Sequence, residues 1–67
     1  MMMQEVIKMF EQGYKVVIGS CEGESAVDEI DEIIDTFEEV EEDPWLSLEI
    51  EVKEDEKVVE LFVQNDE

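Results

Sequence analysis

The chain has 67 residues, of which 22 are acidic and four are lysine, so its formal net charge is −18 at neutral pH. A chain of this length forms one small domain, residues 1–67, and we expect its last residues, 65–67, to fray. The charge argues against direct binding to nucleic acid or to an anionic membrane, and it favours a basic protein partner.

The first predicted element is a helix from Met2 to Gln12. Its apolar residues recur at helical spacing, and Gly13 is a natural C-terminal stop. The β-branched segment Tyr14–Ser20 predicts a strand that is buried on at least one face. Residues 21–24, CEGE, predict a loop, and Cys21 there is interpreted as a small residue at a strand end.

A second helix is predicted from Ser25 to Glu41. Ser25 offers an N-cap, Asp28 follows three residues later, and Pro44 prevents continuation of the helix. One apolar stripe runs along this segment and would face a core; it consists of Val27, Ile30, Ile33, Ile34, Phe37 and Val40.

Two strands are predicted at the C-terminal end, over residues 45–53 and 58–64, because apolar and polar residues alternate in both. A four-residue loop over 54–57 would pair Val52 with Val59, Ile50 with Leu61 and Leu48 with Val63, so that apolar residues always meet. The element order is therefore α-β-α-β-β. We expect an α+β fold, with a three-stranded, largely antiparallel sheet and two helices on one of its faces.

The acidic residues are concentrated in residues 28–43, DEIDEIIDTFEEVEED, where ten of sixteen positions are acidic and none is basic. Like charges recur there at i, i+4 spacing, and each such pair destabilises a helix by about 0.2–0.5 kcal/mol. Acids also crowd the C-terminal end of the helix, where the helix dipole disfavours them. The predicted strand pairing sets Glu51 opposite Glu60, which is also unfavourable. We infer that a partner, rather than folding, accounts for these acids.

The charge density of the second helix resembles that of a nucleic-acid backbone. Nine acids on fifteen residues give about one charge per 2.5 Å along a helix, between the values for duplex and single-stranded DNA. We therefore predict a partner-binding surface on the polar face of this helix, extended by the second-last strand. Its residues are Asp28, Glu29, Asp31, Glu32, Asp35, Glu38, Glu39, Glu42, Glu49 and Glu51.

In size and charge the chain resembles the small acidic DNA-mimic inhibitors made by bacteriophages, and most of all the phage inhibitor of the histone-like nucleoid protein HU. The stretches that carry the resemblance are DEIDEIIDTFEEVEED and EIEVKEDE. The segment QGYKVVI is also similar to the helix-to-strand entry of some anti-CRISPR proteins. The resemblance implies a basic DNA-binding target, with HU expected first and a restriction or CRISPR effector as the alternative.

Three other interpretations remain open. The acids could serve only solubility, or they could reflect adaptation to high salt, although the chain has one alanine and no arginine. The chain could also be an assembly module that homodimerises through an exposed aromatic sheet face, with Trp45 and Phe62 as anchors.

Catalysis is not expected, because the chain has no histidine and Cys21 has no basic neighbour to activate it. The acidic segments do not match the spacing of a calcium-binding loop, and ligands of the usual kind for zinc are lacking. A single cysteine forms no internal disulfide, and no run approaches the roughly 20 apolar residues of a membrane span. Nor does the opening segment resemble a signal peptide. We expect a non-enzymatic cytoplasmic protein without a cofactor or a dedicated metal site.

Overall fold

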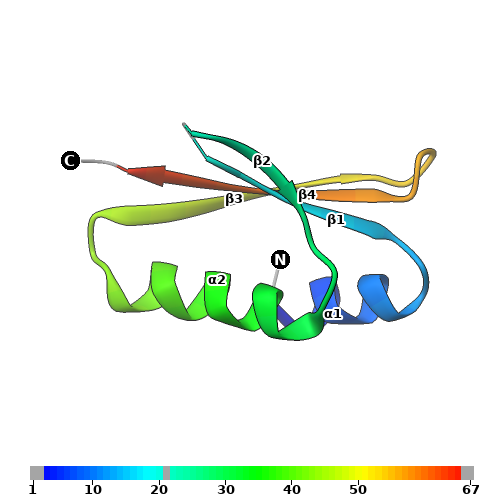
Figure 1. Cartoon of the computed structure of the whole chain (residues 1–67), viewed down its shortest axis with the longest axis horizontal. Coiled ribbons are helices and arrows are strands. Elements are labelled where there is room, and N and C mark those ends of the chain that lie inside the picture. Colours follow the sequence, from blue (N-terminus) through cyan, green and yellow to red (C-terminus); the bar gives the residue numbers. More distant parts are fainter. Residues whose placement is uncertain (1–2, 21, 66–67) are drawn as a thin grey trace.

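The computed structural model describes residues 3–20 and 22–65. These residues form two helices and one four-stranded mixed sheet, with the helices on a single face of the sheet (Figure 1). The elements are α1 (Met3–Glu11), β1 (Lys15–Ser20), β2 (Gly23–Ala26), α2 (Ile30–Glu42), β3 (Leu46–Lys53) and β4 (Val58–Asn65).

Helix α1 ends where the sequence predicts. Gly13 has φ +100°, its N–H donates to the carbonyl of Phe10 at 3.1 Å, and the N–H of Tyr14 donates to the carbonyl of Met9 at 3.0 Å. These two bonds form a Schellman motif, in which glycine adopts the left-handed conformation without a steric penalty. The motif reverses the chain directly into β1.

The sheet has strand order β2-β1-β4-β3, so the prediction of three strands is wrong by one. The additional strand is β2, which covers part of the segment predicted as a loop and takes in Ser25. It pairs antiparallel with β1, while β1 pairs parallel with β4. The sheet is therefore mixed rather than largely antiparallel. The parallel pair joins β1 and β4, which are distant in the sequence, so no local sequence pattern predicts it.

The pairing of β3 with β4 is confirmed in its register. Leu48 lies opposite Val63, Ile50 opposite Leu61 and Val52 opposite Val59. The loop over residues 54–57 is closed by a hydrogen bond from the N–H of Lys57 to the carbonyl of Glu54 at 3.2 Å. The sequence predicts a frayed tail over residues 65–67. Asn65 is instead paired with Leu46 in the sheet. Residues 66–67 lie outside the described residues.

Helix α2 begins at Ile30, five residues later than predicted. Ser25 is therefore not its N-cap. The chain remains extended through Val27, whose N–H donates to the carbonyl of Val16 at 2.8 Å. Val27 is buried as predicted, but as an extension of the strand rather than as part of the helix.

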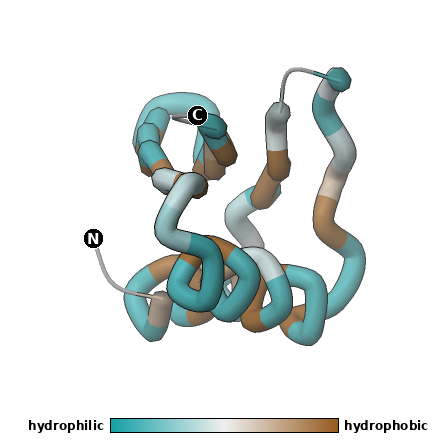
Figure 2. The backbone as a smooth tube through the Cα atoms, turned by 90° about the vertical axis from the view of Figure 1, so that its left-hand side faces the viewer, coloured by the Kyte–Doolittle hydropathy of each residue, from teal (hydrophilic) through white to brown (hydrophobic). Residues whose placement is uncertain are grey.

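The core lies between the two helices and the sheet. Six buried apolar side chains from α1, α2, β1, β4 and the segment before α2 form its centre: Val6, Val16, Val27, Ile33, Val59 and Leu61. Hydrophobic and hydrophilic residues alternate along both the helices and the strands (Figure 2). Each layer therefore buries one side and leaves the other exposed. The outward side of α2 and the outer face of the sheet are the two large surfaces that remain.

Candidate partner-binding surface

The acids of α2 form a continuous stripe on the side that faces away from the sheet. At 100° per residue, Asp31, Asp35, Glu38 and Glu42 lie nearly in line, with Glu32 and Glu39 beside them, opposite the buried Ile33. All six are exposed, and α2 contains no basic residue. We call these six residues the acidic stripe: Asp31, Glu32, Asp35, Glu38, Glu39 and Glu42.

The N-terminal end of the stripe has a role in folding. One carboxylate oxygen of Glu32 accepts the N–H of Asp28 at 2.7 Å and the N–H of Glu29 at 3.2 Å, so Glu32 satisfies two backbone donors that precede the helix. Asp28 and Glu29, which are predicted within the helix, lie just before α2, and both are exposed. The helix dipole also favours acids at this N-terminal end of α2, whereas it disfavours them at the C-terminal end.

The C-terminal end of α2 is fixed by Asp43. Its N–H donates to the carbonyl of Glu39 at 3.2 Å, and its carboxylate accepts the N–H of Trp45 at 2.9 Å. Asp43 thus turns the chain from α2 into β3. For Asp35, Glu38, Glu39, Glu41 and Glu42, by contrast, no hydrogen bond or ion pair of the side chain is found within residues 3–20 and 22–65.

Glu49 and Glu51 do not extend the stripe. They alternate with Leu48, Ile50 and Val52, which pack toward the core and the helices, so their carboxylates lie on the outer face of the sheet. The predicted surface is therefore divided between the two outer surfaces of the molecule. The alternation in the sequence already predicts this result. The helices cover the apolar face of the sheet, so the acids of β3 must lie on the other face.

The outer face of the sheet is not uniformly acidic. The ammonium of Lys53 lies 2.7 Å from the carboxylate of Glu60, which is also directly opposite Glu51. The predicted like-charge pair is present, but Lys53, two residues beyond Glu51 on the same face of β3, offsets it. The hydrogen bond that Lys53 donates to Glu60, together with the negative charge of Glu60, raises the pKa of Lys53. Glu49 in turn accepts a hydrogen bond from the amide of Gln64 at 3.2 Å.

Three of the four lysines lie at one end of the sheet. Val58 of β4 is paired with Lys15 of β1 on one side and with Lys53 of β3 on the other. The N–H of Lys15 also donates to the carbonyl of Lys57 at 2.9 Å. The fourth lysine, Lys8, is on α1. Three of the four cations thus lie near the β3–β4 hairpin, and the acidic stripe has none of its own.

Trp45 and Phe62 do not form one aromatic patch. Trp45 is 58% exposed and precedes β3, whereas Phe62 pairs with Glu49, about 13 Å farther along the strand. Phe62 is half-buried over Gly19, where a Cβ atom would lie 3.1 Å from the phenyl ring. Phe62 therefore covers sheet surface, and Trp45 is the exposed aromatic residue.

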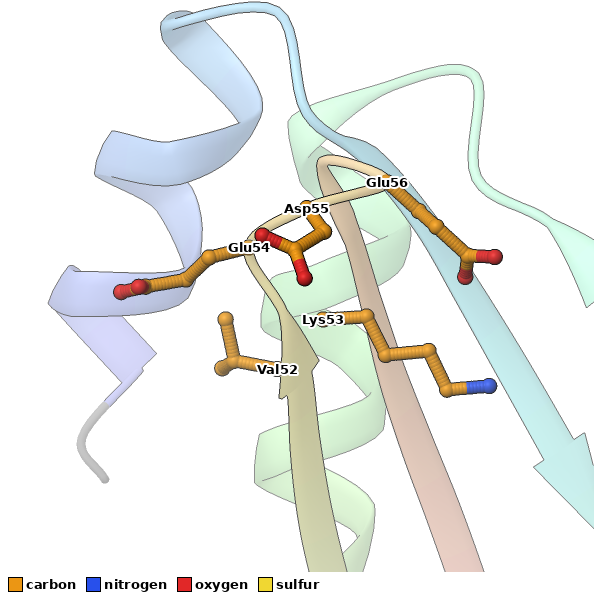
Figure 3. Close-up of a pocket in the computed structure, with 5 residues that line it drawn as sticks. All are labelled: Val52, Lys53, Glu54, Asp55 and Glu56. Atoms are coloured by element: carbon orange, nitrogen blue, oxygen red, sulfur yellow. The ribbon is translucent and has the colours of Figure 1, made fainter.

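The hairpin loop carries three further acids around a hollow of about 640 Å³. Figure 3 shows Glu54 and Glu56 pointing to opposite sides of the loop, with Asp55 between them. Among the described residues, no group of three or more histidine, cysteine or acidic side chains is arranged to hold a metal ion. Cys21 lies outside the described residues.

A groove that the sequence does not predict lies between α2 and β3. It has a volume of about 600 Å³ and is lined by Met3, Phe37, Glu38, Val40, Glu41, Leu48 and Ile50. Its side chains come from three elements, so no single segment of sequence signals it.

Neither helix of the described chain has the length and apolar character needed to cross a membrane. No family of proteins, curated protein or solved structure matches this chain.

Proposed function

We propose that the protein is a non-enzymatic, cytoplasmic inhibitor that binds a basic nucleic-acid-binding protein and covers its DNA site. The observation that carries the proposal is the acidic stripe on α2, which is exposed along its whole length and contains no cation. A protein that grips phosphates with lysine and arginine would meet a comparable row of negative charges there.

The spacing of the stripe supports this proposal. Its six carboxylates span residues 31–42, which gives about one charge per 3 Å of helix axis, against about 1.7 Å in duplex DNA and 3.4 Å in a single strand. Four of these acids, Asp31, Asp35, Glu38 and Glu42, lie nearly in line. Neighbours in this row are separated by a rise of about 4.5–6 Å along the helix axis, which is shorter than the screening length of about 8 Å at physiological salt. A partner therefore interacts with the row as a whole.

Folding accounts for only part of the stripe. Glu32 satisfies backbone donors and Asp31 lies in the favourable first turn, but Asp35, Glu39 and Glu42 repel their neighbours without a compensating contact among the described residues. Solubility alone does not require such a distribution, because interspersed lysines serve it without repulsion.

Following the resemblance in size and acidity, an HU-type nucleoid protein is the first partner to test, and a CRISPR or restriction effector is the second. The experiment is a titration of the HU-type protein with the chain, in which a labelled DNA duplex already occupies the DNA site. The proposal predicts release of the duplex, and an affinity that falls by at least about tenfold between 50 and 200 mM salt. A complex that forms without releasing DNA, or with the same affinity at both salt concentrations, contradicts it.

Exposure of Trp45 favours a second candidate, an assembly module that forms homodimers. Sedimentation of the wild type and of Trp45→Ala separates the two. A dimer that dissociates in the variant supports this candidate, and a monomer in both cases removes it.

A further inference from the structure

The outer edge of β3 is one of the two edges of the sheet. β3 is the last strand in the order β2-β1-β4-β3, and it is eight residues long. In an antiparallel edge strand, alternate residues direct their N–H and C=O groups away from the neighbouring strand. Within residues 3–20 and 22–65, no strand pairs with that side of β3. The edge therefore offers the backbone hydrogen bonds that an extended peptide needs.

The groove beside this edge is apolar where it meets the core. Leu48 and Ile50 form its β3 wall, and Phe37 and Val40 form its α2 wall; all four are half-buried. A strand added to β3 would direct every second side chain to this side of the sheet. Apolar side chains at those positions would gain by covering surface that the fold leaves partly exposed.

The charges near the centre of the edge are negative, and the one cation of β3, Lys53, is its last residue. Glu38 and Glu41 line the groove, and Glu49 and Glu51 stand on the outer face of β3. Side chains of an added strand that do not enter the groove would lie beside Glu49 and Glu51. Basic residues at those positions complement Glu49 and Glu51.

We propose that β3 and the groove bind an extended peptide segment in which apolar and basic residues alternate, as an additional strand of the sheet. The apolar side chains enter the groove between α2 and β3, and the basic ones lie beside Glu49 and Glu51. This mode of binding joins backbone hydrogen bonds, which give affinity, to side-chain pockets, which give specificity. Apart from Glu38, which borders both, it uses a different surface from the acidic stripe, and it does not depend on a DNA-binding partner.

A second copy of the chain does not fit this edge. If β3 pairs antiparallel with β3 of another copy near the strand centre, Glu49 meets either Glu51 or Glu49 of that copy. Like charges that meet in this way are unfavourable, and each copy carries a net charge of −18.

The experiment uses a synthetic peptide of about eight residues in which lysine and isoleucine alternate, with both termini blocked. Two peptides of the same composition serve as controls, one with the lysines and isoleucines in separate blocks and one N-methylated at alternate residues. Binding is measured by NMR titration of the isotope-labelled protein, together with the exchange rates of the amides of β3.

We expect the alternating peptide to shift the amides of Leu46–Lys53 and to slow the exchange of alternate ones, while both controls bind at least about tenfold more weakly. Equal binding by the block peptide would reduce the interaction to unspecific charge attraction and overturn the proposal. So would chemical-shift changes confined to the outward side of α2.

A matched pair of variants separates this surface from the acidic stripe. Glu49→Gln with Glu51→Gln removes the two charges beside the edge of β3, and Asp31→Asn with Asp35→Asn removes two from the acidic stripe. All four positions are exposed, so the fold is not at risk. We expect the β3 variant to bind the alternating peptide about threefold to tenfold more weakly, and the stripe variant to change the affinity by less than about twofold. Equal losses in the two variants contradict the proposal, whatever the outcome with a DNA-binding protein.

Discussion

The carboxylate of Glu32 accepts a hydrogen bond from the backbone N–H of Asp28, with 2.7 Å between oxygen and nitrogen, and a second from Glu29 at 3.2 Å. The contact joins the first turn of α2 to the segment that enters it. It also divides the acids of this region into two groups, since Glu32 stabilises the fold, whereas those farther along the helix have no such contact among the described residues.

The first prediction follows from this division. Glu32→Ala should lower the free energy of unfolding by about 1 kcal/mol, because it leaves two backbone donors without their partner. Asp35→Asn with Glu39→Gln should instead raise it by about 0.5 kcal/mol, because two repulsive i, i+4 pairs are lost. Urea denaturation followed by circular dichroism measures both. A loss of stability in the double variant would mean that these acids also hold the fold together.

The second prediction concerns the end of α1. Gly13→Ala should lower the free energy of unfolding by about 1 kcal/mol, because alanine is strained at φ +100°. Gln12→Ala is the control, since it changes a neighbouring exposed residue that precedes the left-handed position. Thermal denaturation of the two variants should differ clearly, and equal melting temperatures would refute the role assigned to the Schellman motif.

The third prediction concerns Lys57, which has φ +55° in the turn between β3 and β4. Glycine accepts this conformation more readily than any residue with a side chain, so Lys57→Gly should be more stable than Lys57→Ala by about 1 kcal/mol. Both variants lose the same positive charge, and their difference therefore isolates the backbone. Chemical denaturation measures it, and no difference would show that the turn relaxes without penalty.

The fourth prediction is a pH dependence. The hydrogen bond and charge of Glu60 raise the pKa of Lys53, so the ion pair stabilises the folded state fully below the pKa of lysine in the unfolded chain. This stabilisation is lost as the pH rises through the higher pKa of the folded state. NMR titration of the Lys53 side chain should give a lower pKa in Glu60→Gln than in the wild type. An unchanged pKa would mean that the contact does not persist in solution.

The sequence predicts those parts of the fold that local patterns determine. The register of β3 and β4 follows from the alternation together with the four-residue loop, because a shift by one residue would set apolar residues against acids. The end of α1 follows from Gly13, and the buried side of α2 from its apolar stripe.

Other parts of the fold depend on contacts that the sequence does not display. β2 consists of the residues GESA, which lack an alternating pattern and are exposed throughout, so only its pairing with β1 makes it a strand. Ser25 is a good capping residue in isolation, but this pairing holds it in the sheet, and Glu32 then organises the start of α2 instead. The groove beside β3 exists only once three separate elements have come together.

The most direct test of the acidic stripe compares two variants of equal net charge. One is Asp35→Asn, Glu39→Gln and Glu42→Gln on α2; the other is Glu24→Gln, Glu49→Gln and Glu51→Gln on the outer face of the sheet. Displacement of a labelled duplex from an HU-type protein is measured for both and for the wild type. We predict that the stripe variant is at least about tenfold weaker than the wild type while the sheet variant stays within about twofold. Equal displacement by the stripe variant and the wild type would contradict the account.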